Sequence, residues 1–356
     1  MSIRHYRCIF SCNKLAYALE VTVVKPRKYW KNLFWRFVVM ISAALIATTT
    51  TVAAQADTLI PQLVIGPPGD SIRELFDHPN EWSRTRARTG AILCTDHILA
   101  HFSDEELRKW FGLMRSWGIS LELEVGAIKE WGPSAEDTFR AEKPIWDRAV
   151  RLGADIKSIA MDEPLVASRA MLHRPDDYAV VQTAQFVSLV RNSYPAIRIG
   201  DIEPYPAIPL GDHVSWVNQL QERLQQQHVR SLDFYRLDVD WVSFAKTGRG
   251  NWRDVSSLVT TLRTAHLPVS MIYWASGYPS EKAEGIAGND TWYVEVLGQG
   301  YDVADAGIAP DQFVVESWIE APDRIVPENQ EFTFTRSVLD LARKHNVPSK
   351  GNIPRL

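Results

Sequence analysis

The sequence contains little cysteine and lacks the glycine-rich motifs of nucleotide-binding folds. Its 356 residues include three cysteines, Cys8, Cys12 and Cys94. The first two precede the predicted cleavage site described below, and one remaining thiol can form neither an intramolecular disulfide nor a thiolate metal site. We interpret Cys94 as a small buried strand residue. The loop after the first predicted strand reads GPPGD rather than G-x-G-x-x-G, and G-x-x-x-x-G-K-[ST] is absent from the chain, which argues against dinucleotide-binding sheets and P-loop enzymes.

Low-complexity tracts and collagen-like glycine periodicity are also absent. Hydrophobic residues make up 46% of the chain and charged residues 23%, which is typical of a globular protein rather than a disordered one. The length allows one large domain or two small ones.

The N-terminal segment differs in kind from the rest. An apolar run, FVVMISAALIATTTTVAA, follows a basic cluster made of Lys25, Arg27, Lys28, Lys31 and Arg36. Small residues in Ala54-Gln55-Ala56 predict a secretory signal cleaved after Ala56. An uncleaved anchor is the alternative, but the run is short for a membrane span and rich in Thr and Ala. The long prelude leaves open a translation start downstream of Met1. We expect a secreted or periplasmic protein that has no stable membrane partner once the signal is cleaved.

Removing residues 1–56 makes the chain strongly acidic. That segment holds 8 of the 39 Lys and Arg residues and 1 of the 43 Asp and Glu residues, so the mature chain carries 31 minus 42, a charge of about −11 with neutral His. Such a surface repels phosphate backbones, and nucleic acid is not an expected partner.

From Leu59 onward, strand-like runs alternate with helical patterns. The predicted strands are 63–68, 90–97, 119–127, 156–163, 197–204, 232–241, 268–276 and 312–318. Helix-like apolar spacing falls in 103–118, 141–154, 176–194, 212–227 and 254–266. Ser103 and Glu106 fit a capping box, and Gly118 and Gly153 stand where helices are expected to end.

Eight strand-helix rounds in about 300 residues predict a parallel sheet closed into a single (β/α)8 TIM barrel. We therefore assign residues 1–56 to a signal peptide with its basic prelude and residues 57–356 to a (β/α)8 barrel catalytic domain.

Carboxylates gather at the predicted strand ends, where such a barrel builds its active site. They are Glu122 and Glu124 (third strand), Asp162 and Glu163 (fourth), Asp201 and Glu203 (fifth), Asp238 and Asp240 (sixth), and Glu316 (eighth). Glu320 and Glu328, in the loop after the eighth strand, are interpreted as solvated acids.

Side-chain alternation along the strands predicts which of these acids face the barrel interior. In the third strand the apolar residues alternate with Ser120, Glu122 and Glu124, so these three should point inward. In the sixth strand the same reasoning turns Arg236, Asp238 and Asp240 inward and Trp241 toward the helices. A buried charge needs a partner, and we expect Arg236 to neutralise an acid on a neighbouring strand, Glu122 or Asp201.

Aromatic residues share this edge of the predicted barrel, at Trp131, Tyr205, Trp241, Trp274 and Trp318. Flat rings beside acids are typical of sugar-binding clefts, in which a ring stacks on a pyranose face and carboxylates bind its hydroxyls. We predict that the substrate is bound by Glu124, Asp201, Glu203, Tyr205, Asp238, Asp240, Trp131, Trp274 and Trp318. His97 can also reach a sugar hydroxyl, although a lone His after a strand is more often structural.

With these acids in place, the sequence resembles the (β/α)8 glycoside hydrolases. Many of these enzymes carry the general acid as a Glu at the end of the fourth strand, often in Asn-Glu-Pro, and MDEP here is similar with Asp162 in place of Asn. Other families use an adjacent Asp-Glu pair in which Asp orients an acetamido group and Glu is the acid. The resemblance implies that Glu163 is the acid and that Asp162 orients Glu163 or the substrate. The chain departs from the commonest pattern at the seventh strand, SMIYWASG, which carries no acid.

Glycoside hydrolysis needs one protonated carboxyl and a second, ionised one. Like charge from Asp162 and partial burial should keep Glu163 protonated. Glu316, Asp240 and Glu203 remain candidates for the second group, and Glu316 is the one we place with Glu163 and Asp162 in the catalytic set. The predicted function is a secreted hydrolase that cleaves a poly- or oligosaccharide and uses no cofactor or metal.

Metal-dependent barrel enzymes and glycan-binding barrels without catalysis also account for the acids. A metal-dependent (β/α)8 isomerase or epimerase would hold Mg²⁺ or Mn²⁺ through Glu124, Glu163, Asp201 and Asp238, but it explains the aromatic residues poorly, and few His or Lys residues stand at strand ends. An amidohydrolase is weaker, because the first strand has no His-x-His. The other class is a glycan-binding barrel without catalysis.

Overall fold

The structure, a computed structural model, describes residues 5–9, 18–22 and 62–350. The chain divides into two units, Met1–Leu59 and Ile60–Leu356. In the first, β1 (His5–Ile9) pairs antiparallel with β2 (Ala18–Thr22). The predicted apolar run and the cleavage site after Ala56 lie outside the described residues. No helix within the described ranges is long and apolar enough to cross a membrane.

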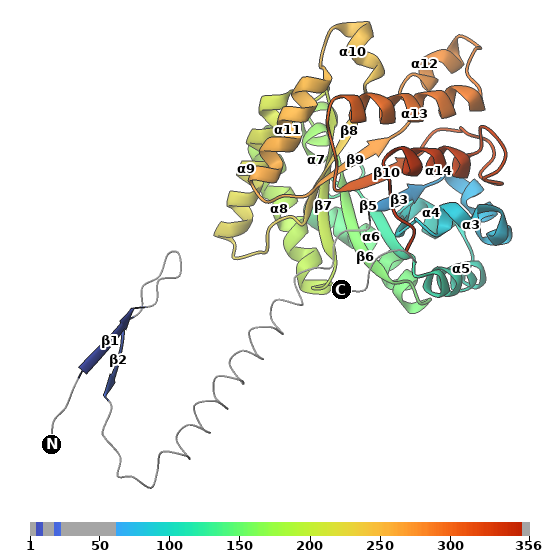
Figure 1. The fold of residues 1–356 in the computed structure, drawn as a ribbon. Helices are drawn as coiled ribbons and strands as arrows, with labels where there is room; N and C mark the ends of the chain where they lie inside the picture. The colour runs from blue at the N-terminus through green and yellow to red at the C-terminus, as the bar shows by residue number, and fades with distance from the viewer. Residues whose placement is uncertain (1–4, 10–17, 23–61, 351–356) are drawn as a thin grey trace. The chain divides into compact units, whose positions relative to one another are not determined.

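The second unit is a closed barrel of parallel strands in the order β10-β3-β4-β5-β6-β7-β8-β9 (Figure 1). The strands are β3 (Leu63–Gly66), β4 (Ala91–Thr95), β5 (Ser120–Val125), β6 (Ile156–Asp162), β7 (Arg198–Tyr205), β8 (Phe234–Val239), β9 (Val269–Tyr273) and β10 (Gln312–Glu316). Each lies within one residue of, or inside, a predicted strand. The prediction of a (β/α)8 barrel is therefore confirmed.

Long helices cover the outside of the barrel (Figure 1). They are α5 (Asp104–Trp117), α6 (Ala135–Arg151), α8 (Asp176–Ser193), α9 (Leu210–Gln226), α11 (Trp252–Thr264), α13 (Asn289–Asp305) and α14 (Phe334–Lys344). The capping box of Ser103 and Glu106 begins α5, and Gly118 ends it with a φ of 62°. The last two helices were not among the helical patterns identified in the sequence.

Shorter helical segments occupy the loops. They are α2 (Arg73–Asp77), α3 (Ser83–Arg86), α4 (Asp96–His101), α7 (Pro164–Val166), α10 (Val242–Thr247), α12 (Tyr278–Ala283), the 3₁₀ turns η1 (Gly69–Ile72) and η2 (Pro79–Trp82), and the π-helical turn η3 (Ala167–Met171). Five of these segments, α4, α7, α10, α12 and η1, lie within a few residues of a strand's carboxyl end.

The barrel interior is filled by side chains and is not a channel. Its apolar layer consists of Val64, Ala91, Leu93, Ala160, Ile202, Phe234, Ile272 and Val314. Gly200 makes room for the largest of these, because a Cβ at this position would lie 2.0 Å from the ring of Phe234. This apolar layer therefore closes the barrel interior beneath the carboxyl ends of the strands.

A buried ion pair lies inside the barrel. Nη2 of Arg236 lies 2.5 Å from Oε1 of Glu122, and both side chains have no exposed surface. Ser158 donates to the other oxygen of Glu122 at 2.6 Å, and Arg236 also donates to Ser270 and Gln312. The expectation that Arg236 neutralises a neighbouring acid is confirmed for Glu122, and Asp201 has a different partner.

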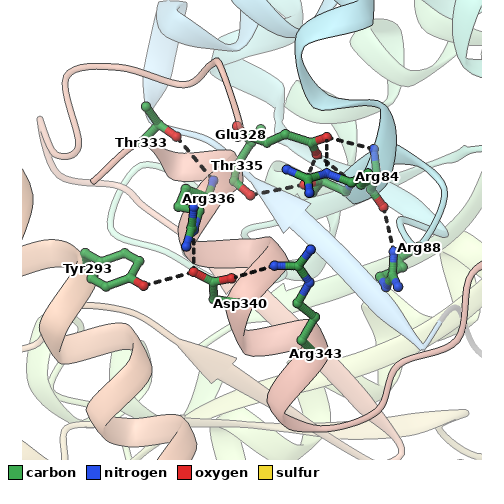
Figure 2. A network of polar contacts seen from close by, with 10 residues as sticks. Arg84, Arg88, Tyr293, Glu328, Thr333, Thr335, Arg336, Asp340 and Arg343 are labelled. Carbon is green, nitrogen blue, oxygen red and sulfur yellow. Dashed lines mark hydrogen bonds and ion pairs between the residues drawn. The ribbon is translucent and has the colours of Figure 1, made fainter. Parts of the chain in front are cut away.

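Glu328 binds the loop after β10 to helix α3, which lies between the first two strands of the barrel, β3 and β4 (Figure 2). Its two carboxylate oxygens accept hydrogen bonds from the backbone and side chains of Arg84 and Thr85 at 2.7–3.0 Å. Glu328 is buried, so its interpretation as a solvated acid was wrong. The partners lie 243 and 244 residues away in the sequence, which a local pattern cannot reveal. Glu320, in the same loop, is exposed and pairs with Lys282.

Candidate active site

Acids from four strands meet at the carboxyl end of the barrel. They are Glu124 from β5, Asp162 and Glu163 from the end of β6, Asp238 from β8 and Glu316 from β10. The alternation of side chains along each strand explains why these acids meet. Glu124 lies on the same face of β5 as Glu122, and Asp238 lies on the same face of β8 as Arg236. Glu122 and Arg236 pair in the barrel interior. The inward direction predicted for Glu122, Glu124, Arg236 and Asp238 agrees with these contacts.

Glu163 lies on a tight turn that brings its carboxyl group to the barrel mouth. Strand β6 ends at Asp162, and Glu163 has left-handed backbone angles of φ 50° and ψ 50° before Pro164 begins α7. A residue before proline avoids the right-handed helical region, and few non-glycine residues adopt the left-handed one. The N–H of Glu163 donates to the carbonyl of Ile202 at 3.1 Å, which ties the turn to β7.

The surroundings of Glu163 favour its protonated form. Burial raises its pKa to about 7, the negative charge of Asp162 acts in the same direction, and Lys129 opposes them. A carboxyl group with this pKa can donate a proton near neutral pH.

Asp162 is paired with a lysine that the sequence analysis did not select. Nζ of Lys129 lies 2.6 Å from Oδ2 of Asp162, and the lysine side chain is 12% exposed. Lys129 follows β5 in GAIKEWG, where Ala127 has a φ of 53°. Nothing in the local sequence indicates that the chain bends back at this point, so the pairing was missed.

Glu316 and Glu124 share a hydrogen bond between their carboxyl groups. Burial and the neighbouring charge of Glu316 raise the pKa of Glu124 well above its usual range, which makes Glu124 the protonated donor of the pair. Burial also raises the pKa of Glu316, to about 7, while Arg236 and the hydrogen bond from Glu124 lower it. Gly66 on the adjacent strand leaves space here, because a Cβ would lie 3.1 Å from Cγ of Glu316.

Aromatic residues border the acids on the β9 and β10 side. The indole Nε1 of Trp274 donates to Oδ1 of Asp238 at 2.8 Å, and its ring centroid lies 4.3 Å from that of Trp318. Trp318 is 52% exposed. It also lines a groove of about 320 Å³ with Pro68, Gly69 and Glu320. Trp131 is similarly exposed and packs across Gly126, where a Cβ would lie 2.8 Å from its ring.

Three residues expected to bind substrate do not face the barrel mouth. Ile202 of β7 points into the interior, so its neighbours in the strand point to the helices. Asp201 accepts a hydrogen bond of 2.6 Å from Nε1 of Trp216 on α9. Glu203 accepts one of 2.6 Å from the N–H of Leu165. Tyr205 is buried and its hydroxyl contacts Asp254.

Glu203 therefore supports the turn that carries Glu163, because its Oε1 accepts the hydrogen bond from the N–H of Leu165. Asp201 was one of four acids proposed to hold Mg²⁺ or Mn²⁺. Its side chain points toward the helices, whereas Glu124 and Asp238 point toward the barrel mouth, so the four acids do not share one site. In the described part of the chain, no group of three or more His, Cys, Asp and Glu side chains is arranged to hold a metal ion.

Two further predicted residues lie at the rim. Asp240 follows β8, and its Oδ1 accepts a hydrogen bond of 3.3 Å from the N–H of Ser243 at the start of α10. His97 is exposed on α4, and its N–H donates to Oδ1 of Asp96 at 2.7 Å. Neither has a described contact with the acids of the barrel mouth.

No protein-family model matches the sequence, and no curated protein matches it. Solved structures do resemble the fold. One of two fungal β-1,4-galactanases matches 80% of this chain and 100% of its own, with 8% identity and a TM-score of 0.50. A GH10 endoxylanase from a sugarcane soil metagenome matches 79% of this chain and 97% of its own, with 8% identity and a TM-score of 0.47. A D-psicose 3-epimerase matches 77% of this chain and 90% of its own, with 12% identity and a TM-score of 0.41.

The closed parallel barrel and the likeness to the galactanase define a class of fold. The chain is a (β/α)8 barrel, and glycoside hydrolases of that class are among the solved structures it resembles, as the sequence predicted. Fold likeness at these identities assigns no reaction, so the reaction has to be argued from the residues of the barrel mouth.

Proposed function

We propose that this protein is an exported glycoside hydrolase that cleaves a poly- or oligosaccharide. The observation that carries the proposal is Glu163, a carboxyl group with a pKa of about 7 beside Asp162 at the mouth of the barrel. Exposed indole rings next to these acids support a sugar as the ligand, because aromatic faces stack on pyranose rings while carboxylates accept hydrogen bonds from hydroxyls.

The proposed reaction uses two carboxyl groups. Glu163 gives its proton to the glycosidic oxygen as the bond between that oxygen and the anomeric carbon breaks. Glu316 is the second group, and its carboxylate attacks the anomeric carbon or removes a proton from the attacking water. The hydrogen bond donated by Glu124 favours the ionised form of Glu316. Asp162 orients Glu163 or a substrate hydroxyl.

Export is proposed from the N-terminal sequence alone. The basic cluster, the apolar run and Ala54-Gln55-Ala56 support a cleaved signal, and a glycan outside the cytoplasm would then be accessible to the enzyme.

The test is release of reducing ends from a panel of polysaccharides and oligosaccharides by the purified protein. Glu163→Gln removes the proton donor and should abolish release from whichever glycan the protein cleaves. Glu320→Gln is the matched control, since Glu320 is an exposed acid paired with Lys282 in a neighbouring loop. Equal activity of the wild-type protein and Glu163→Gln would contradict the role of Glu163. Conversion of a monosaccharide to its isomer, lost on chelation, would instead support a metal-dependent isomerase.

A further inference from the structure

The loop that follows β5 is built to hold Lys129 against the acids of the barrel mouth. Lys129 and Gly132 exchange two backbone hydrogen bonds, of 2.9 and 3.1 Å, which close a tight turn. The hydroxyl of Thr138 donates to the carbonyl of Gly132 at 2.8 Å. At the start of the loop, the N–H of Gly126 donates to Oε1 of Glu142 on α6 at 2.8 Å. Both ends of the loop are therefore fixed to α6.

Stability alone is a weak explanation for this pairing. Burying most of the lysine side chain, which is 12% exposed, carries a desolvation cost that attraction to the 35% exposed Asp162 often fails to offset. Burial works against the charge of Lys129, yet Asp162, and then Glu163 and Glu124, raise the pKa of the ammonium above its usual range. The cation is thus maintained beside the acids.

Lys129 is a cation among acids at the barrel mouth. The charges of Asp162 and Glu163 act on titratable groups of several neighbouring elements, namely Glu124 and Lys129 on β5 and its loop, Glu142 on α6, Asp201 and Glu203 on β7, Asp238 on β8 and Glu316 on β10. All of these except Lys129 are acids. Arg236 is the cation deeper in the barrel, and it is already bound to Glu122.

We propose that Lys129 is a positioning residue of the candidate active site, which fixes the carboxylate of Asp162 beside Glu163 and balances its charge. This assignment rests on the proposed function only where it concerns catalysis. With Oδ2 of Asp162 bound to Lys129, the other oxygen is directed to a substrate hydroxyl or to Glu163. Without the ammonium, the negative charge of Asp162 would act on Glu163 unopposed and would hold its proton to a higher pH.

The test is a titration of Glu163 by carboxyl ¹³C NMR, with its resonance assigned from its loss in Glu163→Gln. In Lys129→Met we expect the midpoint of Glu163 to rise by about one pH unit, because an adjacent opposite charge shifts a carboxyl by roughly 1–3 units. Lys129→Arg keeps the charge and should shift the midpoint much less. Lys143→Met is the matched control, since Lys143 forms a 2.6 Å pair with Asp147 on the outer face of α6.

An unchanged midpoint of Glu163 in folded Lys129→Met would overturn the proposal. If that variant does not fold, Lys129→Gln, which keeps a hydrogen-bond donor for Asp162, is titrated in its place under the same criterion. If a glycan substrate is found, the alkaline limb of kcat/KM should move upward with the NMR midpoint; a lower kcat with an unmoved limb would indicate a merely structural lysine. The NMR result stands even when no glycan is cleaved, so the two proposals fail separately.

Discussion

Trp274 and Asp238 are joined by a hydrogen bond of 2.8 Å from the indole Nε1 to the carboxylate Oδ1. Asp238 lies in β8, and Trp274 directly follows the adjacent strand β9. Trp274 thus contributes both a ring that packs on Trp318 and a donor that orients an acid of the barrel mouth.

Replacing Trp274 with Phe keeps a ring and removes this donor. For the proposed hydrolysis we expect kcat/KM to fall by up to about tenfold, because a hydrogen bond contributes roughly 0.5–1.5 kcal/mol and burial raises the pKa of Asp238 well above its usual range, so that the acceptor is not counted as a full charge. Trp318→Phe is the matched control, since no hydrogen bond from its indole is described, and it should lose less. Similar losses in both variants would show that ring size, rather than the bond to Asp238, matters at this position.

The proposed hydrolysis should have a narrow, bell-shaped pH dependence centred near neutral pH. Glu163 must be protonated, so activity should fall as the pH rises through about 7. Glu316 must be ionised, so activity should also fall as the pH drops below about 7. The two limbs report macroscopic values for a coupled set of acids. A kcat/KM profile from pH 4 to 9 measures both, and full activity at pH 9 would be incompatible with Glu163 as the acid.

Glu328→Gln should lower the free energy of unfolding by about 2 kcal/mol, since an amide nitrogen would face donors from Arg84 and Thr85. Although burial raises the pKa of Glu328, hydrogen bonds from Thr85 and Arg84 outweigh it and lower that pKa. Its stabilising contribution is therefore complete above the unfolded value of about 4.3 and is lost as the pH falls through the folded value.

Denaturant unfolding at several pH values checks this prediction. The difference between the wild-type protein and Glu328→Gln should be largest above about pH 5 and should shrink in acid. Glu331→Gln, an exposed acid of the same segment, is the control and should have little effect. A difference that grows on acidification would contradict the assignment.

Removing one member of the interior ion pair should cost more than removing both. Arg236→Met leaves Glu122 buried without its cation, for which we expect a loss of about 3–5 kcal/mol. The double variant Glu122→Met with Arg236→Met leaves no uncompensated charge and should recover part of that loss. Urea unfolding of the wild type, the two single variants and the double variant gives the coupling energy. Additive losses would mean that the two residues do not stabilise one another.

The barrel itself was predictable because strand and helix patterns are local. The eight buried strands and the capped start of α5 follow from apolar spacing and from Ser103 with Glu106. Inward-facing acids were predicted correctly for β5 and β8, where polar and apolar residues alternate. In β7, RIGDIEPY, apolar residues occur on both faces, since Ile199 faces the helices and Ile202 the interior. The pattern therefore gave no direction for Asp201 or Glu203.

Other features of the site depend on contacts that sequence spacing does not encode. The pairing of Lys129 with Asp162 requires the left-handed turn at Ala127 and the anchoring of the loop by Glu142. The alternation rule also stops at the end of a strand: Asp240 lies one residue beyond Val239, and its Oδ1 accepts a hydrogen bond from the N–H of Ser243.

At Glu163 the left-handed backbone favours glycine for stability, whereas the proposed reaction requires a carboxyl side chain. Glycine adopts such angles without the steric cost that a side chain incurs, roughly 1 kcal/mol. A glycine at this position would relax the turn between Asp162 and Pro164 and would remove the carboxyl group. The protein therefore carries a conformationally unfavourable residue at the centre of its candidate active site, and the stability gained in Glu163→Gly would measure the conformational cost of placing a carboxyl group there.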